Sequence, residues 1–145
     1  MTAPAKMPIR AAWHPRYALA AVIVFLIEVA IALWVRDSFI RPYLGDVLAV
    51  ILVYLGLRAV STIRVLPAAL TALAVGVAVE ITQAADLLGL LGLSDVPVAR
   101  IVLGTSFSVG DLACYAAGAA IAVLVESRRQ AETGAESLAF PREAP

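Results

Sequence analysis

The sequence is poor in the residues on which disulfide-stabilised domains and most metalloenzymes depend. Of its 145 residues, one is cysteine, one is histidine and only 15% are charged. A single cysteine cannot form an internal disulfide, and a single histidine cannot supply a site that needs two imidazoles. Eleven basic residues balance eleven acidic ones, so no net charge attracts nucleic acid. We therefore expect no metal, no cofactor and no nucleic-acid partner.

Apolar residues are what the sequence has in excess. Hydrophobic side chains make up 62% of the chain, and the mean hydropathy is +0.93. An ordinary soluble domain contains roughly 45–50% apolar residues. A chain this short has a large surface relative to its volume and too few polar residues to cover it. The composition predicts an integral membrane protein and excludes a soluble enzyme.

Four apolar segments approach or reach the length of about 20 residues that a helix needs to cross a bilayer. None of the eight prolines interrupts them, as expected because proline is tolerated only at helix ends and in loops. The segments are residues 17–35, 44–60, 66–88 and 109–125. The sequence thus predicts an all-α bundle of four transmembrane helices.

Lysine and arginine indicate how this bundle is oriented. Four spans place both termini and the middle loop on one side, which carries eight of these residues against three on the other. Because positively charged loops stay in the cytoplasm, we expect cytoplasmic termini. We predict a cytoplasmic segment over residues 1–16, the transmembrane domain over 17–125 and a disordered cytoplasmic tail over 126–145.

The outer connection between the third and fourth helices, residues 89–110, is long and mostly apolar. Such a segment does not extend freely into water. We expect it to lie at the membrane interface or to fold over the bundle, with a short helix over residues 98–103.

Glu80 is the polar residue that most needs an explanation. A charged side chain in mid-bilayer costs on the order of 2.5–3.5 kcal/mol, so one that persists has a partner or a task. Gln83 lies on the same helical face. That face continues as a stripe of small residues that permits close helix packing: Ala68, Ala72 and Gly76. Either Glu80 and Gln83 line a polar cavity, or Glu80 is paired with Arg41 or Arg100, or is protonated and hydrogen-bonded.

Asp46 and Asp111 open the two inward-running helices. Capping of the helix N-termini explains them, and so does a shared outer-side site, in which Tyr115 points to the same seam. Glu28 has no polar neighbour on its own face, and we interpret it as a tolerated or paired carboxylate. The candidate ligand-binding residues are Arg41, Asp46, Glu80, Gln83, Arg100, Asp111 and Tyr115.

The order of several short segments resembles the family catalogued as domain of unknown function 2809, small bacterial membrane proteins without an assigned activity. The segments are residues 41–48 (RPYLGDVL), 79–83 (VEITQ), 100–107 (RIVLGTSF) and 111–115 (DLACY), followed by Gly118. The resemblance spans residues 17–125 and implies a place in the bacterial inner membrane. It marks Gly45, Asp46, Glu80, Gln83, Arg100, Leu103, Gly104, Phe107, Asp111, Tyr115 and Gly118.

A membrane glutamate with a glutamine three residues later, then an arginine and an aspartate opening the last helix, is more remotely similar to the VanZ-like proteins. Some of those are linked to glycopeptide resistance at the cell envelope.

No catalytic motif decides between enzyme and binding protein. His14 lies on the cytoplasmic side, away from the acidic residues, and Cys114 falls within an apolar helix, so a serine or cysteine triad at the outer face is excluded. Our leading hypothesis is an outer-face site for a lipid headgroup or another envelope component, held by Arg41 and Arg100.

Three alternatives remain open. The protein is a structural or interaction subunit, a proton- or ion-coupled transporter, or a carboxylate-based enzyme acting on lipid-linked substrates. As a subunit it would form a homo-oligomer through small-residue seams on its third and fourth helices; the fourth-helix residues are Ala113, Ala116, Ala117 and Ala120. Membrane lipids are the expected partners.

Overall fold

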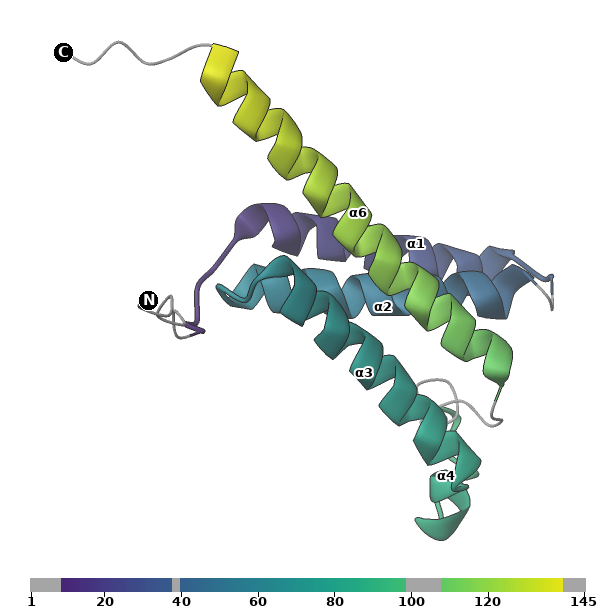
Figure 1. Ribbon diagram of the computed structural model, residues 1–145. Helices are drawn as coiled ribbons and strands as arrows, with labels where there is room; N and C mark the ends of the chain where they lie inside the picture. Colours follow the sequence, from purple (N-terminus) through teal and green to yellow (C-terminus); the bar gives the residue numbers. More distant parts are fainter. Residues whose placement is uncertain (1–8, 38–39, 99–107, 140–145) are drawn as a thin grey trace.

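The structure is a computed structural model that describes residues 9–37, 40–98 and 108–139. Its helices are α1 (Pro15–Trp34), α2 (Ile40–Val60), α3 (Val65–Ala84), α4 (Leu87–Leu90) and α6 (Val109–Ala139). Among the helices in this part of the chain, four are long and apolar enough to cross a membrane: α1, α2, α3 and α6. The predicted all-α bundle of four spanning helices is confirmed (Figure 1).

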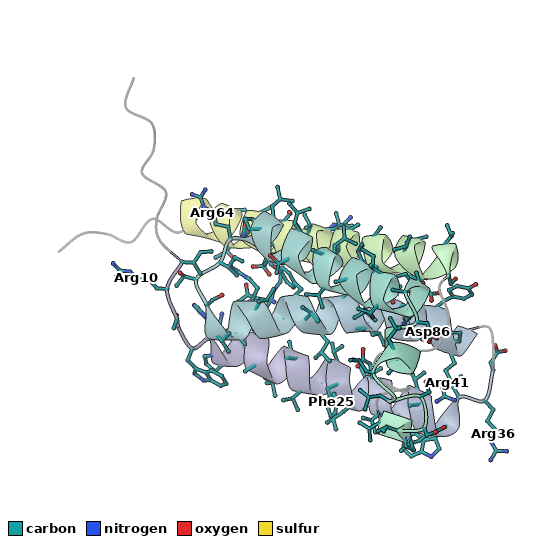
Figure 2. The ribbon with its side chains drawn as sticks, turned by 90° about the horizontal axis from the view of Figure 1, so that it is seen from below. Arg10, Phe25, Arg36, Arg41, Arg64 and Asp86 are labelled. Atoms are coloured by element: carbon teal, nitrogen blue, oxygen red, sulfur yellow. The ribbon has the colours of Figure 1, made fainter. Side chains whose placement is uncertain are left out.

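α2 is the central helix of the bundle. It contacts α1 on one side and both α3 and α6 on the other, and α3 also packs against α6. Figure 2 shows this order, with α1 along one edge and α3 and α6 along the other. Among the described helices, α1 packs closely against α2 alone, and none of its side chains is buried. The core therefore lies between α2, α3 and α6.

The two ends of the bundle carry different connections (Figure 2). Arg36, Arg41 and Asp86 lie at one end, which we call the site end, and Arg10 and Arg64 lie at the other, which we call the terminal end. At the terminal end, residues 10–14 run alongside residues 59–62. The Ala12 amide donates to the Val60 carbonyl at 3.0 Å, and similar bonds on either side fix the start of α1.

α6 continues well past the end that hydropathy predicts. The sequence predicts a disordered tail from residue 126, whereas residues 126–139 continue this helix, and residues 127–135 are exposed. Figure 1 shows it extending beyond the other helices. Alanine and glutamate are the commonest residues of this segment, and both are good helix formers. Extending an existing helix avoids the costly nucleation step, so a polar segment that follows a spanning helix can stay helical. The polar composition of residues 126–139 therefore did not by itself show that they are helical.

The other helix limits differ less from expectation. α2 begins at Ile40 rather than at residue 44, and α3 ends at Ala84, followed by the separate short helix α4. Asp86, between them, has a φ of 46°, a left-handed conformation that ends α3. Apart from Val98, the short helix predicted over residues 98–103 falls outside the described residues.

Small residues allow the core helices to approach closely. The stripe predicted on α3 is buried, together with Glu80 at its end. A Cβ atom added to Gly118 of α6 would lie 2.6 Å from the Val47 carbonyl oxygen of α2, and one added to Gly76 would lie 2.9 Å from the Tyr115 ring. Glycine at both positions brings α6 against its two neighbours.

Candidate functional site

Three helices carry a polar side chain at the same depth below the site end. Glu28 lies six residues before the end of α1, and Asp46 and Tyr115 lie six residues after the starts of α2 and α6. At 1.5 Å per residue, each is about 9 Å from its helix end. The alternating helix directions therefore bring together residues that are distant in sequence.

These side chains border one cavity of about 460 Å³. Its walls come from α1, α2 and α3, with Tyr115 contributed by α6. The polar lining residues are Glu28, Arg41, Asp46, Gln83 and Tyr115. Farther from the site end the lining is apolar and includes Val53, Ala72 and Val75. The cavity is therefore polar near the site end and apolar toward the middle of the bundle.

The structure describes six of the seven candidate residues, and these six lie in two positions. Four of them, Arg41, Asp46, Gln83 and Tyr115, line the cavity. Glu80 and Asp111 lie behind its wall, where both interact with Asp46. Arg100 falls outside the described residues.

Glu80 has a structural role that the sequence did not indicate. Its side chain is 1% exposed, and one carboxylate oxygen accepts a hydrogen bond from the Ser108 backbone N–H. Ser108 is the N-cap of α6, since its hydroxyl oxygen accepts a hydrogen bond from the Gly110 N–H at 3.2 Å. Glu80 thus ties the end of α3 to the start of α6. Across residues 9–37, 40–98 and 108–139, no ion pair joins it to Arg41.

Asp46 and Asp111 differ in their relation to the helix ends. Asp111 lies in the first turn of α6, where the helix dipole favours a carboxylate. Because α2 begins at Ile40, Asp46 lies in the second turn and does not cap its helix. The Asp46 carboxyl lies near Asp111 and Tyr115 and interacts electrostatically with Asp111 and Glu80. In the described part of the chain, no such group of side chains is arranged to hold a metal ion.

Glu28 belongs to the cavity lining, although its own helix gave no sign of this. One of its carboxylate oxygens is shielded from solvent and accepts no hydrogen bond from any residue that the structure describes. The sequence feature that could have predicted this is the distance of Glu28 from the end of its helix, which equals the distance of Asp46 from the start of the neighbouring antiparallel helix. A comparison of positions along one helix does not detect such a match.

A second polar cluster, at the terminal end, was also not predicted. The Arg58 guanidinium donates to the Tyr17 hydroxyl at 2.7 Å and to the Ile63 carbonyl at 2.5 Å. The Tyr17 hydroxyl donates to Glu126 at 2.5 Å, and Arg58 forms an ion pair with Glu126 at 3.4 Å. We call Tyr17, Arg58 and Glu126 the terminal clasp, because they join α1, α2 and α6. The i+4 spacing of Tyr54 and Arg58 on α2 was the signal for a polar interior face.

The outer surface of the bundle shows which class of protein this is. Large apolar side chains are exposed along α1, with Phe25 at 52% and Leu33 at 68%. Such a continuous apolar surface is stable in lipid and not in water. Together with the lengths of the four apolar helices, it defines a multi-pass membrane protein.

The particular family follows from a comparison of sequences. The family described as "Protein of unknown function (DUF2809)" matches residues 35–119, more than half of the chain, and the protein belongs to it. The match contains the cavity residues of α2 and α3 together with Tyr115, and excludes α1 with Glu28. No curated protein and no solved structure matches the chain.

Proposed function

We propose that this protein binds a membrane amphiphile, such as a lipid or a lipid-linked component of the cell envelope, with its polar head in the cavity. The observation that carries this proposal is the composition of the cavity wall. Polar groups from four helices surround one end of the cavity, and apolar side chains surround the other. A molecule with a polar head and an apolar chain matches both parts.

The proposal includes an orientation in the membrane. The excess of Lys and Arg at the terminal end favours a cytoplasmic location for that end. The site end, with the cavity mouth, then faces the outside of a bacterial inner membrane. A ligand would enter from the outer leaflet or from the envelope.

A cavity-filling substitution tests whether the ligand occupies this cavity. Ala49 lines it, so Ala49→Trp places an indole in the space. Ala116→Trp puts the same side chain on an exposed position of α6 outside the lining and is the matched control. Native mass spectrometry of the purified proteins is expected to show a co-purifying amphiphile that is lost in Ala49→Trp and kept in Ala116→Trp. Equal retention by both variants would place the ligand elsewhere.

Proton- or ion-coupled transport is a second candidate function, favoured by a separate observation. The carboxyl groups of Asp46, Glu80 and Asp111 interact within one apolar bundle, and such groups mark ion and proton pathways in other membrane proteins. In proteoliposomes with a trapped pH-sensitive dye, transport predicts a proton flux that Asp46→Asn abolishes. A flux equal to that of empty liposomes would remove this candidate.

A further inference from the structure

The cavity opens toward the side of the bundle as well as toward its end. α1 and α3 both pack closely against α2 but not against each other, and the cavity lies between them with α2 as its floor. The lining residues Ala32, Ala49 and Val75 are themselves exposed. Val75 lies nine residues before the end of α3, about 13 Å below it at 1.5 Å per residue. The opening therefore extends to the depth of the acyl chains.

The polar groups in the cavity follow an order with depth. Arg41 lies in the first turn of α2, at the rim, and its side chain is exposed. Glu28 and Asp46 lie about 9 Å along their helices from the helix ends at the rim, between the rim and the apolar part of the lining. If the apolar chain of an amphiphile occupies the apolar part of the cavity, the polar group that is attached directly to this chain lies against the carboxyl groups of Glu28 and Asp46.

Charge and unsatisfied hydrogen bonding identify the kind of head that fits. The described lining carries two carboxyl groups and one guanidinium, and Asp46 also interacts with Asp111 behind the wall. The shielded oxygen of Glu28 accepts no hydrogen bond from the described residues, and leaving such a group unsatisfied is costly. A phospholipid would bring its phosphate, the group next to its chains, against these carboxyl groups. A cation at that position would pair with them.

Building on the proposed function, we propose that the cavity binds lipophilic cations, meaning amphiphiles whose ammonium or comparable cationic group lies directly beside their apolar part. Glu28 and Asp46 pair with the cation, and the walls formed by α1 and α3 hold the apolar part. The exposed Arg41 at the rim opposes a second positive charge and selects monocations.

Two ions of nearly identical shape and opposite charge provide the test. Tetraphenylphosphonium and tetraphenylborate are measured by equilibrium dialysis against the full-length protein in phosphatidylcholine nanodiscs, with binding to empty nanodiscs subtracted. We expect saturable binding of the phosphonium and none of the borate. Ala49→Trp is expected to abolish the phosphonium binding, while Ala116→Trp preserves it.

Glu28→Gln tests the role of the carboxyl group. This change is not expected to disturb the fold, because α1 has no buried residues. Loss of one charge-assisted contact is expected to weaken phosphonium binding by about tenfold or more. Glu132→Gln removes an exposed carboxyl of α6 outside the cavity and is expected to leave binding unchanged. Arg41→Gln is expected to strengthen phosphonium binding several-fold.

Three results would overturn the proposal. They are preferential binding of the borate, unchanged phosphonium affinity in Glu28→Gln, and absence of saturable binding of both ions. Loss of a co-purifying amphiphile in Ala49→Trp, observed alongside any of these, would leave the proposed function in place and reject only the cationic head.

Discussion

At the scale of single residues, two glycines set the distances between helices. Gly118 brings α6 against the backbone of α2, and Gly76 accommodates the Tyr115 ring. Nothing lies within 4 Å of a Cβ atom added to Gly56 or Gly134. The same substitution therefore has opposite expected effects at different positions in one bundle.

Gly118→Ala is expected to lower the stability of the protein by about 1–3 kcal/mol, the usual cost of overpacking a core. The added methyl group meets a carbonyl oxygen that is fixed in α2, so the helices must separate. Gly134→Ala is the control, and it is expected to be neutral or to stabilise α6 because alanine is the better helix former. Thermal unfolding in detergent, followed by circular dichroism, measures both. Equal melting temperatures for the two variants would contradict the close packing of α2 and α6.

Glu80→Ala is expected to destabilise the protein by about 1.5–3 kcal/mol, the range for hydrogen bonds that involve a charged group. The change leaves the Ser108 N–H at the start of α6 without its acceptor. Glu80→Gln keeps an oxygen at the same position and is expected to recover part of the loss. Thermal unfolding compares the two variants. If glutamine were as harmful as alanine, the carboxyl charge would matter more than the contact with Ser108.

At the scale of helices, the sequence predicted which segments span the membrane better than it predicted the roles of the polar residues within them. Long apolar runs fix the number and approximate limits of the spanning helices, because no other structure satisfies the backbone in lipid. The stripe of small residues on α3 also correctly indicated a buried face. The roles of Glu28 and Glu126 were not predicted, since each depends on the alignment of neighbouring helices and hydropathy carries no information about alignment.

The terminal clasp leads to a prediction about helix association. Arg58→Met is expected to destabilise the protein by roughly 3 kcal/mol, because it leaves Glu126 nearly buried without its cation. The double variant with Glu126→Leu is expected to be more stable than Arg58→Met alone, since both charges are then removed. Chemical unfolding in mixed micelles of the two single variants and the double variant completes the cycle. Additive losses would show that Arg58 and Glu126 do not interact.

At the scale of the whole molecule, the distribution of charge and the position of the cavity make one joint prediction about orientation. In a Cys114→Ala background, Ala85→Cys places a thiol at the site end and Gln130→Cys places one on α6 beyond the terminal end. Both positions are exposed. In intact bacterial cells, a membrane-impermeant maleimide is expected to label Ala85→Cys only. Labelling of Gln130→Cys before the cells are permeabilised would reverse the orientation.

The assembly of the molecule depends on the surfaces that the fold leaves free. The stripe on α3 is used within the chain, whereas the four alanines predicted as a seam on α6 are exposed: Ala113, Ala116, Ala117 and Ala120. A homo-oligomer formed through small residues would therefore use α6. In the Cys114→Ala background, Ala117→Cys is expected to form disulfide-linked dimers upon oxidation if the protein forms a homo-oligomer through α6. A purely monomeric product would argue against it.

The peripheral position of α1 has a consequence for how the protein responds to its surroundings. This helix forms one wall of the cavity, yet among the described helices it packs closely against α2 alone, and the hydrogen bond from Tyr17 to Glu126 ties it to α6 only near the terminal end. Lateral pressure in the bilayer acts directly on such a wall. Tightly packed lipids would push it inward and shrink the space beside Glu28, while thinner or more fluid bilayers would let it lean away. Ligand uptake should thus vary with lipid composition even when no lipid competes for the site.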